Sequence, residues 1–262
     1  MASPIPIEAP VITATLPDNE AAAEFKSAMR VCNLTSLSSQ GGVESSASQH
    51  GECRVHILLM SALLPLFPLD LVLLPAVPLS LHIFEPRYKE MINECLTQNR
   101  HFGIVRSKEE ALASIGCTAE IINVMKTHPD GRMDILTEGK RRFEVLELNQ
   151  ERSFLQADVI YLDDENEPAA APDLETALRL HGEIMELAGA QPEDSQKTDS
   201  SQLAYRLAGS LPFDPDFQQT LLEMNSEADR IRSIIAFFER ILPALQQSAR
   251  AKRKAGGNGH VH

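Results

Sequence analysis

An apolar stretch interrupted by prolines, residues 62–92, constrains the fold more than any other feature of the chain. From residue 66 to residue 74 it is almost continuously apolar, which is atypical of a surface segment. Four prolines between residues 65 and 78 exclude a helix, because each lacks an amide proton and collides with the preceding turn. We therefore predict buried extended chain in a small sheet or barrel, with the prolines at strand ends or edges.

The periodicity changes after Pro86, a residue whose fixed φ suits the first position of a helix. Apolar side chains then recur at helical spacing (i, i+3, i+4, i+7 and i+8), at Tyr88, Met91, Ile92, Cys95 and Leu96. This pattern predicts a helix with one buried face that follows the extended segment directly.

The segment FPLDLVLLPAVPLSLHIFEPRYKEMI (67–92) resembles the opening of the Lon N-terminal domain, the substrate-binding region of the ATP-dependent protease Lon. The similarity continues in GCTAEIINV (116–124), DGRMDILTEGKRRFEVLE (130–147) and LLEMNSEADRIRSIIAFFERIL (221–242). It covers about residues 62–247 and leaves both ends of the chain unexplained.

The resemblance implies an α+β fold, with a small β-barrel-like (PUA-like) N-terminal subdomain followed by an α-helical bundle. It also implies a non-catalytic protein that recognises unfolded or degradation-marked polypeptides, with hydrophobic clients as partners and a role as adaptor for a protease or chaperone. The alternative that the resemblance leaves open is a PUA-like module that binds a ligand or RNA. An uncharacterised enzyme is a third hypothesis.

Four regions are expected along the chain. Residues 1–60 are either a disordered extension or a misassigned start, with translation beginning at Met60. Residues 61–165 form the β-rich subdomain, and an acidic and Ala-Pro-rich stretch at 163–173 precedes the helical subdomain, residues 170–247. Residues 248–262 are predicted to be a disordered tail that is basic and then Gly-rich.

Within the β-rich region we predict about six strands. HPDGR (128–132) has the composition of a hairpin turn, and Gly139 with KRR (140–142) suggests a second bend. Phe143, Val145 and Leu146 are then expected to face the core.

In the helical region, Leu178 is assigned to the apolar face of a helix over residues 174–189. Asp214 is predicted to cap one helix, and Ser226 with Asp229 has the spacing of a capping box at the start of another.

Composition restricts the classes of partner. The net charge of −13 disfavours nucleic acid and anionic membranes. No membrane span is predicted, since the apolar stretch 57–84 contains Asp70 and prolines and its uninterrupted pieces are shorter than the roughly 20 residues that a bilayer requires. The first thirty residues lack the pattern of a secretion signal, and the four cysteines show no close pairing. We predict a cytoplasmic protein without a zinc site.

No catalytic, cofactor-binding or metal-binding residue is predicted, and the substrate-binding residues stay unassigned. A P-loop is absent from the sequence, as is the Gly-Pro-Ser-Ala-Gly setting of the Lon peptidase dyad. For His82 we favour a histidine that is hydrogen-bonded at a packed edge over a ligand.

Three charged groups are weighed as binding sites. The first, Glu85, Arg87 and Lys89, is interpreted as a helix start in which Arg87 pairs with a neighbouring carboxylate or carbonyl. For the second, the acidic residues Asp163, Asp164, Glu165 and Glu167, we favour a solvated linker over a cation site. The third, Lys140, Arg141 and Arg142, is the local basic patch on which the RNA-binding alternative depends.

Overall fold

The computed structural model describes residues 63–109, 111–165, 168–189 and 202–256. The first part contains β1 (Leu64–Leu69), β2 (Pro78–Ile83), α2 (Pro86–Gln98), β3 (Phe102–Lys108), β4 (Ala111–Leu112), β5 (Ile115–Thr127), β6 (Met133–Asn149) and β7 (Gln156–Leu162). Four helices follow: α3 (Ala171–Leu187), α4 (Leu203–Gly209), α5 (Pro215–Glu223) and α6 (Glu227–Gly256). The two expectations for residues 1–60 fall outside the described residues.

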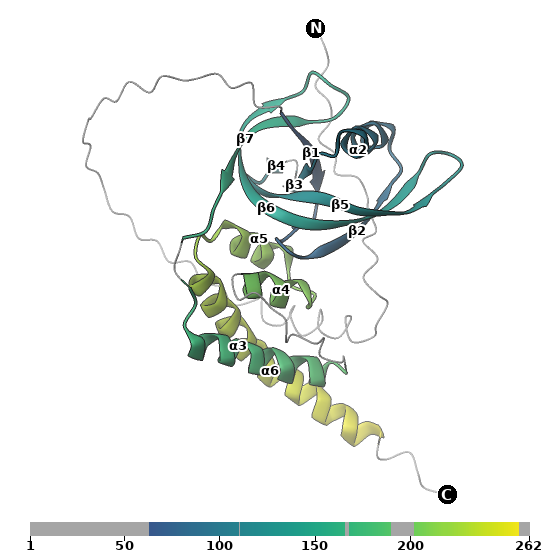
Figure 1. Cartoon of the computed structure of the whole chain (residues 1–262). Coiled ribbons are helices and arrows are strands. Elements are labelled where there is room, and N and C mark those ends of the chain that lie inside the picture. Colours follow the sequence, from purple (N-terminus) through teal and green to yellow (C-terminus); the bar gives the residue numbers. More distant parts are fainter. Residues whose placement is uncertain (1–62, 110, 166–167, 190–201, 257–262) are drawn as a thin grey trace, which may run out of the picture.

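The strands form one mostly antiparallel sheet that closes on itself (Figure 1). β1 pairs with β7 in antiparallel fashion and with β3 in parallel fashion, so β1, β7, β6, β5 and β3 make a ring. β2 pairs with β6, and the short β4 pairs with β3. The predicted α+β fold is confirmed, with seven strands in the sheet where about six were expected.

The sequence had suggested prolines at strand ends or edges. Pro65 and Pro68 instead lie inside β1. The amide of Leu66 donates to Leu155 O on the β7 side, and successive amides of a strand alternate between its two edges. The nitrogen of Pro68 therefore faces the β7 side beyond the end of that ladder, and Pro65 faces the β3 side before that ladder begins. Neither proline removes a ladder hydrogen bond. Both are therefore tolerated in a strand whose six residues are all buried.

Helix α2 begins at Pro86, as predicted, and buries Tyr88, Met91, Ile92 and Cys95. The assignment of Leu96 to the same buried face is wrong, because its side chain is 41% exposed. The helix ends at Gln98, and the cap residue Asn99 has a φ of 49°, the left-handed conformation common at helix C-termini.

Strands β5 and β6 form a long hairpin closed by the predicted turn at residues 128–132, where Gly131 has a φ of 80°. The predicted second bend at residues 139–142 does not divide the strand, because β6 runs without interruption from Met133 to Asn149, but its pairing with β5 shifts register between Gly139 and Arg142. Gly139 instead permits a close backbone approach: a Cβ there would lie 2.1 Å from Leu74 O. The prediction that Leu146 faces the core is also wrong, because its side chain is 57% exposed.

Helices α3 and α6 pack side by side below the barrel, and α4 and α5 lie between them and the strands (Figure 1). Asp214 caps α5 as predicted, accepting from Asp216 N at 2.8 Å, and Ser226 Oγ accepts from Asp229 N at 3.4 Å. Leu178 of α3 was assigned to an apolar face but is 39% exposed.

The expected disordered tail is wrong for residues 248–256, because α6 continues to Gly256. Alanine, arginine and lysine dominate this segment and are strong helix formers. Residues 257–262 lie outside the described part of the chain.

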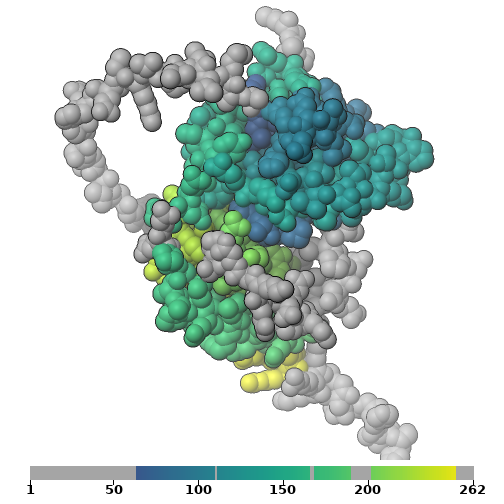
Figure 2. Space-filling model, in the orientation of Figure 1, coloured from purple at the N-terminus to yellow at the C-terminus, as the bar shows by residue number. Residues whose placement is uncertain are grey.

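One hydrophobic core joins the barrel to the helices. It includes Phe67 of β1 and Phe102 of β3 together with Phe237 and Phe238 of α6. A second, smaller cluster fills the barrel around Phe143. In the space-filling view the barrel and the helices are in direct contact (Figure 2). Among the helices that the structure describes, none combines the length and the apolar character needed to cross a bilayer.

Candidate functional site

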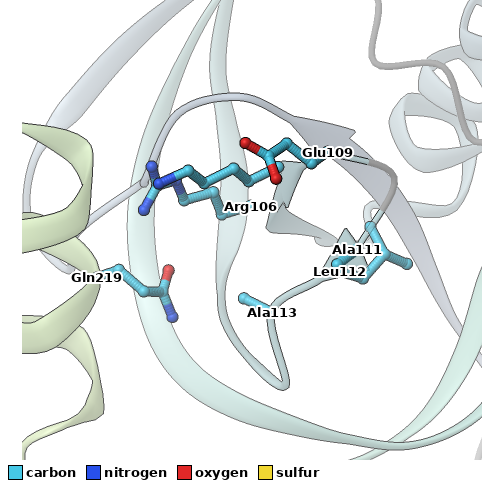
Figure 3. A pocket seen from close by; sticks show the side chains of 7 residues that line it. Arg106, Glu109, Ala111, Leu112, Ala113 and Gln219 are labelled. Carbon is cyan, nitrogen blue, oxygen red and sulfur yellow. The ribbon is translucent and has the colours of Figure 1, made fainter.

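A pocket of about 330 Å³ lies between the β3–β4 hairpin and helix α5 (Figure 3). Its lining residues come from both parts of the fold: Arg106, Lys108, Glu109, Ala111, Leu112 and Ala113 from the hairpin, and Gln219 from α5. This β3–α5 pocket is at the lower end of the volumes that bind small molecules or single side chains.

The cationic wall of the pocket is largely neutralised within the protein. Arg106 Nη1 lies 2.6 Å from Asp216 Oδ1, and Lys108 Nζ lies 3.1 Å from the same carboxylate. Hydrogen bonds from Arg106 and then from Lys108 hold the pKa of Asp216 below its ordinary value. The pocket is therefore unsuited to a strongly anionic ligand, whose charge would compete with Asp216.

Two polar atoms of residues in the pocket wall lack hydrogen-bond partners. Gln219 Nε2 donates to Ile115 O at 3.1 Å and to Glu223 Oε1 at 2.9 Å, which leaves Gln219 Oε1 unpaired. Arg106 Nε is likewise buried without a hydrogen bond. Arg106 Nε, which lies 3.8 Å from Asp70 Oδ1, and Gln219 Oε1 thus offer a donor and an acceptor from the two sides of the pocket, suited to a backbone C=O and a backbone N–H.

A second candidate surface lies on the outside of β6 and β7. Ile160 is 50% exposed and lies opposite Glu144. A register shift between Val145 and Glu147 leaves Leu146 as an extra residue on β6, which explains its exposure at a position expected to be buried. We call Leu146 and Ile160 the β6–β7 outer surface. The carboxylates Glu144, Glu147 and Asp158 occupy neighbouring positions of the same strands.

His82 is hydrogen-bonded at a partly exposed edge of the sheet, as the sequence suggested. Its Nδ1 lies 2.5 Å from Asp134 Oδ1, and His128 Nε2 lies 2.9 Å from Asp134 Oδ2. Hydrogen bonds from His82 and then His128 lower the pKa of Asp134. Neither His128 nor Asp134 was singled out from the sequence, because no short spacing links them to His82.

The first charged group, Glu85, Arg87 and Lys89, serves the start of α2. Glu85 is the residue that precedes the helix, and Arg87 Nε donates to its carboxylate at 2.8 Å, as predicted. Lys89 Nζ donates to Asp130 O in the hairpin turn at 3.0 Å. These side chains are thus engaged in contacts within the protein.

The three cations that RNA binding would need, Lys140, Arg141 and Arg142, are all paired within the protein. Arg142 is buried and donates to Leu222 O at 2.9 Å and to Met224 O at 2.7 Å. Lys140 is paired with Glu120 and Glu138, and Arg141 is paired with Asp163. With these cations neutralised, the arrangement offers little to a phosphate backbone.

The interpretation of the acidic residues as a solvated linker is wrong for Asp164. Its carboxylate pairs with Arg142 of β6 at 2.7 Å and also with Arg230 of α6, two side chains that are themselves buried. Arg230 pairs in addition with the buried Glu227 at 3.0 Å. A sequence pattern could not identify this cluster, because its members are separated by 22 and 66 positions.

A contact between His181 and Ser210 has the residue types of a catalytic pair, with Nε2 2.7 Å from Oγ. The Ser210 hydroxyl donates to Leu207 O at 2.9 Å, so its only proton is not directed at the imidazole. Burial lowers the pKa of His181. The contact joins α3 to the end of α4 and lacks the geometry of an activated nucleophile.

Comparison with known proteins gives consistent matches. Residues 63–240 match the model of the ATP-dependent protease La (LON) substrate-binding domain. Lon protease 1 of Hydrogenovibrio crunogenus is 25% identical over 196 residues, which are 69% of this chain and 24% of that protein. Lon protease of Parabacteroides distasonis is 32% identical over 110 residues, which are 38% of this chain and 13% of that protein. The chain therefore spans about a quarter or less of the length of these relatives.

Solved structures share the fold. A Lon N-terminal domain protein from Xanthomonas campestris has a TM-score of 0.55 and 25% identity, covering 67% of this chain and 98% of that one. The N-terminal domain of Mycobacterium avium complex Lon protease has a TM-score of 0.51 and 16% identity, covering 68% and 98%. The match over residues 63–240 takes in both the barrel and the helices, and the chain belongs to the LON substrate-binding domain family.

Proposed function

We propose that this protein binds unfolded or degradation-marked polypeptides without modifying them and presents them to an ATP-dependent protease. The observation that supports this most is the β6–β7 outer surface, where Leu146 is 57% and Ile160 50% exposed on a domain of the substrate-binding family. Apolar side chains held on a rigid barrel offer a client hydrophobic contact without ordering the protein further.

The carboxylates of Glu144 and Glu147 refine the choice of client. They occupy positions beside the two apolar side chains, on a chain whose net charge is −13. Such a surface favours apolar segments that also carry lysine or arginine and disfavours acidic segments. The proposal therefore concerns a hydrophobic, mildly cationic polypeptide segment.

The β3–α5 pocket provides a second contact for the same client. Arg106 Nε can donate to a backbone C=O of an extended chain, and Gln219 Oε1 can accept from a backbone N–H. Both atoms are almost fully covered, so a client reaches them only when the β3–β4 hairpin shifts. Two residue pairs hold β4 to β3, together with the bond from Ala113 N to Arg106 O, and the ion pairs of Arg106 and Lys108 with Asp216 oppose this shift.

The proposal places the protein in the cytoplasm, in keeping with its free thiols. Cys95 and Cys117 are unpaired and buried. Burial raises the pKa of Cys95 to about 11 and that of Cys117 to about 12, so both stay protonated and unreactive at neutral pH.

The test is fluorescence anisotropy of a labelled, permanently unfolded protein titrated with the full chain. It is run at about 50 mM and about 200 mM salt, with the folded form of the same labelled protein as control. Micromolar binding that salt barely changes and that the folded control lacks supports the proposal. Absence of binding contradicts it, and affinity that falls steeply with salt favours a mainly electrostatic partner instead.

A further inference from the structure

Three potential metal ligands meet beside the base of the β5–β6 hairpin turn. His82 lies near the end of β2, Asp134 lies at the start of β6, and His128 follows the last residue of β5. One ligand atom from each side chain can be chosen so that all three lie within 4.8 Å of one another. Among the described residues no other group of three histidine, cysteine or carboxylate side chains meets this condition.

The backbone fixes all three positions. His82 and Asp134 are directly opposite in the antiparallel pairing of β2 with β6. The amide of His128 donates to Arg132 O at 2.8 Å, and the amide of Gly131 donates to His128 O at 2.9 Å, which closes the turn. Ligands carried by paired strands and a closed turn need little ordering when an ion binds.

The donor atoms suit a borderline transition metal. Two imidazole nitrogens face the two oxygens of one carboxylate, at 2.5 and 2.9 Å. Imidazole with carboxylate is a donor set that Zn²⁺ accepts, and three protein ligands leave a coordination position for water. Two nearby cations are engaged elsewhere, since Arg132 Nε bonds Asp130 at 2.6 Å and Lys89 Nζ bonds Asp130 O at 3.0 Å, while Lys126 lies opposite Asp134 in the pairing of β5 with β6.

The spacing fits after small side-chain movements. Ligand atoms around a tetrahedral Zn²⁺ are roughly 3.3 Å apart, as follows from bonds of about 2.0 Å. The two histidine–aspartate contacts, 2.5 and 2.9 Å, must lengthen slightly to admit the ion. The side chains of His82, Asp134 and His128 are 37%, 29% and 19% exposed, so they have room to move and the ion has a path from solvent.

We propose that His82, His128 and Asp134 form a binding site for a divalent transition-metal ion of the zinc class. The ion replaces the two histidine–aspartate hydrogen bonds with coordinate bonds and ties β2 to the base of the hairpin turn.

The test is calorimetric titration of Zn²⁺ into the full chain carrying His260→Gln and His262→Gln, which removes two tail histidines that could bind the ion nonspecifically. The expected result is one Zn²⁺ per chain, with affinity reduced about tenfold or more by each of His82→Gln, His128→Gln and Asp134→Asn. His101→Gln is the matched control, an exposed histidine outside the site, and should leave the affinity unchanged.

Co²⁺ provides the second readout, because its visible spectrum reports the donor atoms. Ligand-field bands without a sulfur charge-transfer band are expected, since neither buried cysteine takes part. Circular dichroism of each metal-free variant verifies folding. If Asp134→Asn does not fold, the Zn²⁺ affinities of the two histidine variants still test the site. Absence of Zn²⁺ binding, equal affinity in the His82→Gln/His128→Gln double variant, or a thiolate spectrum would overturn the proposal.

Discussion

Arg142 of β6 donates to Asp164 at 2.7 Å, and this pair connects the barrel to the segment that leads into the helices. The same guanidinium donates to the carbonyls of Leu222 and Met224 at the end of α5. Arg230 of α6 pairs with the other side of the Asp164 carboxylate. Buried charges thus join three parts of the fold that are distant in sequence.

Replacing Arg142 by methionine should lower the free energy of unfolding by about 2–3 kcal/mol, because Leu222 O loses its side-chain donor while Asp164 and Met224 O keep only their bonds from Arg230. The measurement is urea denaturation followed by circular dichroism. Arg141→Met is the control, since Arg141 is exposed and its ion pair with Asp163 is open to solvent. Equal losses in the two variants would show that the buried cluster has no special role.

Gly139→Ala should be among the most destabilising small substitutions. The added methyl would lie 2.1 Å from Leu74 O, a backbone atom that cannot move without breaking the bonds between residues 76–77 and Gly139. We expect a loss of about 3 kcal/mol in the free energy of unfolding. Gly182→Ala in α3 meets nothing within 4 Å and should instead stabilise by about 0.5–1 kcal/mol. A tolerated alanine at position 139 would contradict the close strand approach.

Tyr205→Phe should leave stability unchanged or raise it by up to about 1 kcal/mol. The Tyr205 ring is buried with Arg230 above it at 4.4 Å, but its hydroxyl has no hydrogen-bond partner. Removing an unsatisfied buried hydroxyl removes a desolvation cost. Thermal and urea unfolding of the two proteins test this, and a loss above about 1 kcal/mol would mean that the hydroxyl is satisfied in solution.

Asp216 should contribute stability that disappears in acid. Its folded pKa is lowered, first by the hydrogen bond from Arg106, so its contribution is present above the ordinary value of 3.8 and is lost as pH falls through the folded pKa. Because the carboxylate is 62% exposed, we expect only about 0.5 kcal/mol. Asp216→Asn should be less stable than the parent at neutral pH and equal to it well below that value. A difference independent of pH would contradict this assignment.

Local patterns predicted the parts of the fold that local physics determines. Pro86 and the spacing of Tyr88, Met91 and Ile92 define α2, and Asp214 marks the start of α5. Regions shaped by distant contacts were missed. Gly139 was interpreted as part of a bend from the local sequence alone. Its close approach to Leu74 O involves a segment 65 positions earlier (139 − 74), which no local pattern shows.

The candidate site was harder to predict for the same reason. Leu146 has the apolar character of a core residue, and only the register shift against β7 exposes it. Arg142 was expected in a basic patch and Asp164 in a solvated acidic linker, but the two side chains pair with each other. Both outcomes depend on strand register and on the approach of the helices, which composition does not encode.

If the β6–β7 outer surface binds polypeptides, replacing its two apolar side chains should weaken binding, and a comparison of three proteins tests this. The full chain, its Leu146→Gln/Ile160→Gln variant and a Leu178→Gln control are titrated against the same labelled unfolded protein; Leu178 is a half-exposed leucine on α3, away from this surface. Each half-exposed side chain is worth roughly 1 kcal/mol when buried by a client, so the double variant should bind roughly tenfold or more weakly, with the control unchanged. Equal binding by all three proteins would contradict the claim.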